Sequence, residues 1–298
     1  MRTLSFKKID AFASINSTGN PAAVVYLDAI DELTENEMLQ LAKELKGFVS
    51  EVGFVCPGTD VDYQLRYFSS EREVDFCGHA TIAILNDIIA NDEEMQLKPT
   101  LSIATQTDRL MVENRYKEAN SVYISAPSPQ FSVKTIKIAE ITSALNCPID
   151  DLDKLLPVQI VNGGLETLVV PMTGLEAILS VTPDLRRLNE FCMQIGVDII
   201  ILYSSETVIQ GSNYRTRVFA PTFGYLEDPA TGSGNSAFGY YLMNHNMWDG
   251  EMIRIEQNGF RDTPNFIQLF SKQDDPADSR VWFGGGAVLK IEGQYILS

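Results

Sequence analysis

A single glutamate interrupts an apolar run in the first part of the chain, and this position makes it a candidate proton carrier. Glu51 lies between Ser50 and Val52 in the run 48–55, which is typical of a buried strand. A carboxyl group shielded from water has a raised pKa and can act first as a general base and then as a general acid. Strand alternation could equally turn Glu51 toward solvent, so the sequence leaves its burial open.

Cys77 and His79 form a second candidate group at the start of an apolar helical segment. An imidazole at a helix N-terminus is less basic than a free one, which predicts that His79 is a neutral donor or a proton relay. The alternative is an ordinary structural hydrogen bond. Cys77 beside this base could be a thiolate nucleophile, although an inert buried cysteine is the commoner case. The sequence shows no second ligand near His79 or His245, the two histidines, so no metal site is expected.

Two glycine-containing turns each precede an apolar segment and could bind an anion. Gly78 begins the first segment, and Gly232, Ser233 and Gly234 begin the second. The free N–H groups of a first helical turn attract anions, so they could hold a small carboxylate and stabilise the charge that develops on its neighbouring carbon. The glycines could instead simply allow a helix to pack closely. Asp228, just before the second turn, could cap that helix or bind an amine or hydroxyl of the substrate.

The two turns belong to an internal repeat. The segment 19–25 (GNPAAVV) resembles the segment 164–170 (GLETLVV), and residues 66–80 resemble residues 217–234. Val170 follows Val25 by 145 residues, and Gly232 follows Gly78 by 154, which is close to half the chain. The repeat therefore predicts two similar halves.

Each half contains one segment that is apolar on nearly every side, 79–90 in the first and 233–243 in the second, as in a buried helix. The residues therefore predict two similar halves of strands and helices, each with its strands around a central helix. In the first half, Thr34 and Glu37 form a capping box that predicts an amphipathic helix.

Composition narrows the function classes. With 298 residues the chain suits two domains, and 45% hydrophobic with 21% charged residues is ordinary for a globular protein. A net charge of −17 argues against binding to nucleic acid or to a membrane surface. Four dispersed cysteines without a C-x-x-C pair suggest neither disulfides nor a zinc knuckle, and no apolar leader or membrane-length segment is present. We expect a cytoplasmic protein with a small-molecule partner.

Several motifs together resemble the PhzF (phenazine biosynthesis PhzF-like) family, whose fold is shared with diaminopimelate epimerase and proline racemase. The likeness covers nearly the whole chain. The matching segments are 8–12 (KIDAF), 19–25 (GNPAAVV), 50–55 (SEVGFV), 75–81 (DFCGHAT), 217–221 (RVFAP), 227–233 (EDPATGS) and 284–288 (GGGAV).

The resemblance implies a diaminopimelate epimerase-like fold of class α/β (α+β), with two pseudo-symmetric domains, each a curled mixed β-sheet around a central helix. In this chain the domains would comprise residues 1–125 plus 286–298 and residues 126–285, with the active site between them. The resemblance also implies an isomerase without a cofactor. In this family a glutamate moves a proton within a small cyclic acid, as in the isomerisation of trans-2,3-dihydro-3-hydroxyanthranilate; Glu51 matches that glutamate. His79, Asp228 and Ser233 match other pocket residues, and Gly78 and Gly232 match positions of backbone contact. Members are often homodimers, and a role in a biosynthetic process is implied.

Two departures limit the resemblance. The epimerase relatives carry a cysteine in each half, whereas this chain has Cys77 in the first and Thr231 in the second, which rules out a two-thiol mechanism. The family's Gln-Gly and Gly-Arg-Pro pattern is altered in 257–264 (QNGFRDTP), so the substrate can differ. Two alternatives stay open: a thiol enzyme acting through Cys77, and a metabolite-binding protein without catalysis.

Overall fold

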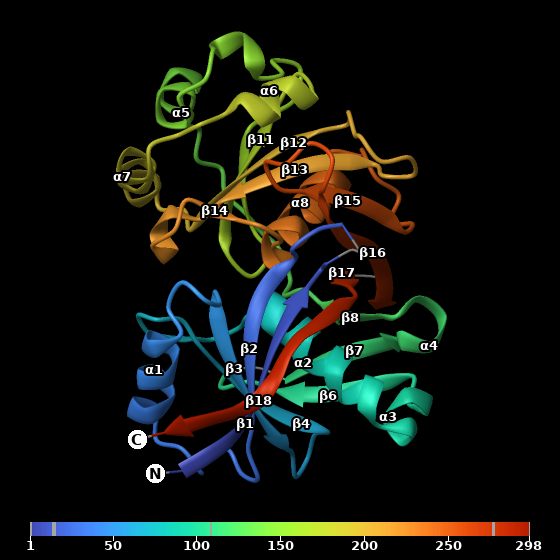
Figure 1. Ribbon diagram of the computed structural model, residues 1–298. Coiled ribbons are helices and arrows are strands. Elements are labelled where there is room, and N and C mark those ends of the chain that lie inside the picture. Colours follow the sequence, from blue (N-terminus) through green and yellow to red (C-terminus); the bar gives the residue numbers. More distant parts are fainter. Residues whose placement is uncertain (1, 14–15, 108, 276–277, 298) are drawn as a thin grey trace. The chain divides into compact units, whose positions relative to one another are not determined.

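The computed structural model describes residues 2–13, 16–107, 109–275 and 278–297. The chain forms two compact units (Figure 1). Unit 1 comprises Met1–Ser125 and Gly284–Ser298, and unit 2 comprises Ala126–Phe283. Each unit is described by itself.

Unit 1 is built on a mixed sheet with the strand order β18-β1-β2-β3-β4-β6-β7-β8. The pairs β2–β3 and β4–β6 are parallel, the others are antiparallel, and β5 pairs with β4. Its strands are β1 (Arg2–Ala11), β2 (Asn20–Tyr26), β3 (Glu51–Pro57), β4 (Tyr63–Phe68), β5 (Glu73–Val74), β6 (Thr100–Ala104), β7 (Arg109–Arg115), β8 (Ser121–Ser125) and β18 (Ala287–Leu297). Its helices are α1 (Glu35–Glu44), α2 (Gly78–Asn91), α3 (Glu93–Leu97) and α4 (Tyr116–Ala119).

Unit 2 has a sheet of the same kind, in the order β9-β10-β11-β12-β13-β15-β16, in which β11–β12 and β13–β15 are parallel. Its strands are β9 (Gln130–Phe131), β10 (Gln159–Asn162), β11 (Glu166–Pro171), β12 (Ile199–Ser204), β13 (Tyr214–Phe219), β14 (Glu227–Asp228), β15 (Ile253–Gln257) and β16 (Asn265–Asp275), and β17 (Asp278–Gly285) leads from it into unit 1. Its helices are α5 (Ile138–Leu145), α6 (Leu175–Ser180), α7 (Leu185–Ile195) and α8 (Gly232–Asn244), with short 3-10 turns η1 (Ile149–Asp151) and η2 (Pro221–Phe223).

The internal repeat of the sequence is a repeat of topology. The run β2-β3-β4-β5-α2-β6 of unit 1 corresponds to β11-β12-β13-β14-α8-β15 of unit 2, with its two parallel pairs in the same places. Both copies contain a bidentate ion pair across equivalent strands. Arg66 binds Glu73 through two N–H···O contacts of 2.6 Å, and Arg217 binds Glu227 at 3.0 and 2.8 Å.

The central helix of each unit is buried on nearly every side, as the sequence predicted. Helix α2 contacts β1, β2, β3, β8 and β18, which come from both ends of the sheet, so the sheet curls around it. Gly53 on β3 makes this closeness possible, because a Cβ there would lie 2.6 Å from Ile84 Cδ1. Helix α8 contacts β10, β11, β12 and β16 in the same manner.

Helix α1 begins where the capping box predicted. Thr34 is the N-cap, its side chain accepts from the Glu37 N–H, and Glu37 accepts in return from the Thr34 N–H. The predicted strand 48–55, by contrast, starts too early. Phe48 is 45% exposed, and a turn at Gly47 with φ of +82° precedes the strand, which begins at Glu51. Phe48 is an apolar residue of the preceding turn, and its apolar character led to its assignment to the strand.

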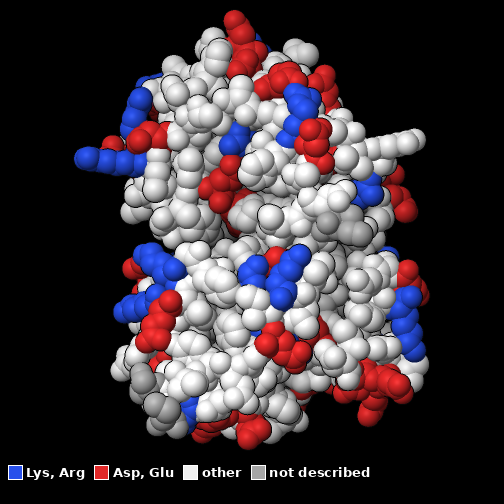
Figure 2. Space-filling model, viewed as in Figure 1, with Lys and Arg blue, Asp and Glu red and all other residues white. Residues whose placement is uncertain are grey.

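Acidic and basic side chains are scattered over the displayed face of each unit, with no continuous basic surface on that face (Figure 2). This pattern accords with the strong excess of Asp and Glu over Lys and Arg. Among the described residues, no helix has the length and apolar character needed to cross a membrane.

Candidate active site

Glu51 is the first residue of β3 and lies opposite Ala22 of β2 in a parallel pair. Its exposure is only 6%, so the question that strand alternation left open is answered in favour of burial. The preceding residue is also fixed, since Ser50 Oγ donates to Asn20 Oδ1 at 3.0 Å. The buried carboxyl group therefore lies at the N-terminal end of an interior strand of the sheet.

The start of α2 brings His79 and Cys77 to this carboxyl group. His79 Nε2 lies 3.1 Å from Glu51 Oε2, and Cys77 Sγ lies 3.5 Å from His79 Nδ1. The contact between His79 and Glu51 is a close ion-pair contact, and Glu51 Oε2 has no geometrically defined hydrogen bond among the described residues. Cys77 is the N-cap residue, and its carbonyl accepts from Thr81 Oγ1 at 2.7 Å, which fixes the first turn. Glu51 and His79 thus form a buried, close acid–base pair.

The pKa of His79 differs in direction from the sequence prediction. Burial disfavours the imidazolium, but the neighbouring Cys77 and then Glu51 favour it, and the balance raises the pKa of His79 well above 6.5. The loss of basicity predicted from the helix start is therefore wrong, because these two neighbours outweigh the effect of burial. Burial also raises the pKa of Cys77 above 9.0, so Cys77 is a neutral thiol near neutral pH.

The second predicted group lies in unit 2, where β14 ends and α8 begins. Asp228 is buried, and its Oδ1 accepts from the Ala230 N–H at 3.4 Å. It is not the helix cap, because the N-cap residue of α8 is Thr231. Neither N-cap residue, Cys77 of α2 or Thr231 of α8, makes a side-chain capping hydrogen bond in the described part of the chain. The N–H groups of a first helical turn attract anions, so both turns are candidate anion sites.

The glycines at the start of α8 have a packing role as well. A Cβ on Gly232 would lie 2.2 Å from Phe283 Cε2, and a Cβ on Gly234 would lie 3.1 Å from Ile199 Cδ1. Ser233 lies between them and is half-buried, beside Gly164. Gly232 thus allows close packing against Phe283, which was one of the two roles that the sequence left open. This packing role does not exclude anion binding by the backbone N–H groups.

Gln257 holds the turn that carries Asp228, a role that the sequence did not suggest. Its Oε1 accepts from the Thr231 N–H at 3.0 Å and from Asn235 Nδ2 at 2.6 Å. Its Nε2 donates to the Asp228 carbonyl at 2.8 Å and to Thr231 Oγ1 at 3.1 Å. Asn265 adds a bond from its Nδ2 to the Pro229 carbonyl at 2.8 Å. No residue near Gln257 in the sequence signals this role.

The two units differ at equivalent positions. Register equates Glu51, opposite Ala22, with Ile199, opposite Thr167, and the start of α2 equates Cys77 and His79 with Thr231 and Ser233. Where unit 1 has a carboxyl, a thiol and an imidazole, unit 2 has an isoleucine and two hydroxyls. The titratable groups at these three positions therefore occur in one half only.

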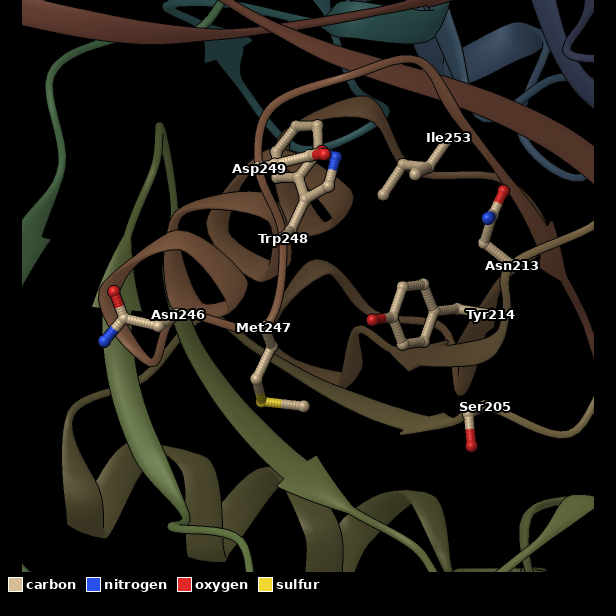
Figure 3. Close-up of a pocket in the computed structure, with 8 residues that line it drawn as sticks. All are labelled: Ser205, Asn213, Tyr214, Asn246, Met247, Trp248, Asp249 and Ile253. Atoms are coloured by element: carbon tan, nitrogen blue, oxygen red, sulfur yellow. The ribbon is translucent and has the colours of Figure 1, made fainter.

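A separate pocket of about 660 Å³ lies in unit 2 (Figure 3). Its wall includes Tyr214, Met247, Trp248 and Ile253, and its one carboxylate is Asp249. None of its eight lining residues was a predicted site residue. It offers no carboxyl–imidazole pair, so the acid–base chemistry is better sought at Glu51 and His79.

A duplicated α/β fold with central buried helices, together with a buried carboxyl–imidazole pair, defines the class of epimerase-like two-domain proteins. Comparison with known proteins narrows this class. The chain belongs to the PhzC-PhzF family, described as phenazine biosynthesis-like protein, whose family model matches residues 9–293.

Relatives and solved structures agree with this assignment. The chain is 31% identical over 259 residues to an uncharacterized isomerase, YfhB, of Bacillus subtilis (strain 168), covering 86% of this chain and 87% of the relative. It is 28% identical over 293 residues to the trans-2,3-dihydro-3-hydroxyanthranilate isomerase of Pseudomonas fluorescens, covering 97% and 98%. A PhzF-family protein of Bacillus anthracis superposes with a TM-score of 0.88 at 24% identity over 99% of this chain and 100% of that one. A hydroxyproline epimerase of Agrobacterium vitis superposes with a TM-score of 0.62 at 11% identity, over 98% and 92%.

These findings confirm three predictions from the sequence: the family, the epimerase-like α/β fold, and an isomerase as the class of enzyme. The structure also corrects one expectation about His79. The sequence showed no second ligand near it, yet Glu51 and Cys77 both lie within 4.8 Å, because the start of α2 folds against the start of β3.

Proposed function

We propose that the protein is a cofactor-independent isomerase in which Glu51 moves a proton within a small carboxylic acid. Glu51 takes a proton from a carbon next to the bound carboxylate or unsaturated system and returns it to another carbon of the same molecule. The observation that carries this proposal is the buried Glu51 carboxyl group at 3.1 Å from the His79 imidazole.

The other predicted residues bind and orient the substrate in this proposal. His79 and Asp228 position its polar groups, whereas Ser233 and the backbone N–H groups around Gly78, Gly232 and Gly234 bind its carboxylate. The uncapped first turns of α2 and α8 support this role, since N–H groups there attract anions. A preorganised donor of this kind is worth about 3 to 4 kcal/mol in comparable sites. The proposal requires the two groups of residues to contact the same substrate.

In this proposal a single carboxyl group, Glu51, performs both proton transfers. Ile199 at the position equivalent to Glu51, and Thr231 at the position equivalent to Cys77, cannot exchange a proton near neutral pH. This supports an isomerisation over a two-base racemisation. A thiol mechanism is disfavoured, because burial raises the pKa of Cys77.

The substrate class is proposed from the single-carboxylate mechanism and from the name of one relative. We propose a small, cyclic or unsaturated carboxylic acid related to trans-2,3-dihydro-3-hydroxyanthranilate, on which the Pseudomonas fluorescens relative acts by its name. The homodimer and the cytoplasmic location that the sequence predicts are also part of the proposal. Light scattering on the purified protein tests the dimer.

Proton transfer is tested by deuterium incorporation. Candidate acids are incubated with the protein in deuterated water, and the products are followed by NMR. Wild-type protein should place deuterium in the product, and Glu51→Gln should lower the rate by about 10²- to 10⁴-fold. Glu113→Gln is the matched control, because Glu113 is another buried glutamate of unit 1, paired with Arg115. Activity that survives Glu51→Gln at the control's level would contradict the mechanism.

A metabolite-binding protein without turnover is the alternative outcome. In that case an acid would bind, measured by calorimetry, with the same affinity in wild type and Glu51→Gln, and no acid that binds would acquire deuterium. Full activity in Cys77→Ala, expected here, disposes of the thiol enzyme.

A further inference from the structure

Three different metal-binding side chains converge at the start of α2. Glu51, Cys77 and His79 each offer one ligand atom, and these atoms all lie within 4.8 Å of one another. His79 Nε2 is 3.1 Å from Glu51 Oε2 and 3.8 Å from Cys77 Sγ. All three residues are buried, which holds the atoms in place.

The donor set and its spacing suit a zinc ion. Imidazole nitrogen, thiolate sulfur and carboxylate oxygen are the three ligand types that Zn²⁺ binds in proteins. A tetrahedral ion with bonds of about 2.0 to 2.3 Å separates its ligand atoms by roughly 3.3 to 3.6 Å. The observed separations of 3.1 and 3.8 Å lie close to this range, and all three ligand atoms lie within 4.8 Å of one another.

An independent observation points to a ligand at this place. Glu51 Oε2 is buried and has no hydrogen-bond partner among the described residues, although His79 lies beside it. A buried carboxylate oxygen without a hydrogen-bond donor is unfavourable, and coordination to a cation supplies the missing partner.

We propose that Glu51, Cys77 and His79 form a Zn²⁺ site and that zinc binding there switches the isomerase off. The three residues supply three ligands, and water or the carboxylate of a bound metabolite supplies the fourth. The proposal that zinc binds depends only on the geometry of the three side chains. The proposal that zinc inhibits the enzyme rests on the proposed function, because a metal-bound Glu51 cannot accept a proton from the substrate.

Cobalt(II) provides a readout that does not depend on activity. Chelator-treated protein is titrated with Co²⁺ without oxygen, and the thiolate-to-cobalt band in the near ultraviolet and the visible bands of tetrahedral cobalt are recorded. Zn²⁺ is then added to displace the cobalt. Wild type should bind one equivalent with a thiolate band. Cys77→Ser should lose that band and bind more than about 100-fold more weakly, since even outer-shell changes cost 10- to 100-fold.

Cys56→Ser is the matched control, because Cys56 is a buried cysteine on the same strand as Glu51. It should bind cobalt as wild type does. Absence of one-equivalent binding in wild type, or a thiolate band that persists in Cys77→Ser, would overturn the site.

Inhibition is measured separately, by the deuterium assay with one equivalent of Zn²⁺ and then with excess chelator. Zinc should stop wild-type turnover and chelator should restore it, whereas Cys77→Ser should need more than about 100-fold more zinc. Zinc that binds without slowing turnover would overturn the inhibition. A normal cobalt spectrum in a protein that turns over no acid would leave the metal site standing and refute the proposed function instead.

Discussion

Replacing Gln257 should destabilise unit 2 far more than its single amide suggests. The side chain makes four hydrogen bonds: it accepts from the Thr231 N–H and Asn235, and it donates to the Asp228 carbonyl and Thr231 Oγ1. Each intramolecular hydrogen bond contributes about 0.5 to 1.5 kcal/mol net. Gln257→Ala should therefore lower the free energy of unfolding by roughly 2 to 6 kcal/mol.

The assay can be restricted to the unit that carries the change. Trp248 and Trp282, the two tryptophans of the chain, both lie in unit 2, so tryptophan fluorescence during urea unfolding reports on that unit. Gln194→Ala is the control, because Gln194 is exposed on α7 of the same unit and should change the free energy by less than about 0.5 kcal/mol. A loss below about 1 kcal/mol for Gln257→Ala would refute the network as the support of the Asp228 turn.

Two further changes test the packing and the electrostatics. Gly232→Ala should cost about 1 to 3 kcal/mol in urea unfolding, because its Cβ would lie 2.2 Å from Phe283 Cε2; an unchanged midpoint would show that the ring moves freely. His79 has a raised pKa in the folded protein, so its contribution to stability is complete below its unfolded pKa of about 6.5 and is lost as pH rises through the folded value. The wild type should therefore exceed His79→Gln in free energy of unfolding by more at pH 6 than at pH 9, and the opposite trend would contradict the assigned direction.

Features that depend on local sequence were predictable. The capping box at Thr34 and Glu37 is formed by residues three apart. The buried helices α2 and α8 are predictable because each has apolar residues on nearly every side. The repeat was visible for a similar reason. Gly19 and Gly164 both adopt positive φ, +64° and +121°, just before the equivalent strands β2 and β11, and few residues other than glycine do so.

Features that depend on distant partners were not predictable in the same way. Helix position alone suggested a less basic His79, but its pKa depends on Cys77 and also on Glu51, which lies 28 positions earlier in the chain. The Gln257 network joins β15 to the turn before α8, and nothing within a few residues of Gln257 indicates which groups its amide will meet.

The burial of Glu51 shows why alternation failed at the residue that matters most. Alternation distinguishes a buried face from a solvated one only when a strand has one face in water. Strand β3 has β2 and β4 on its two edges, and it contacts both α1 and α2. Its residues from Glu51 to Cys56 are all buried, so the strand has no solvated face to which a carboxylate could be assigned.

A charged residue in such a strand needs an interaction with a distant residue or with a ligand. His79 lies 3.1 Å from Glu51 Oε2, but this oxygen has no hydrogen-bond partner among the described residues. The same strand position in unit 2 holds Ile199, which shows that the fold itself does not require a carboxylate there. The acid in unit 1 is therefore better explained by chemistry than by stability.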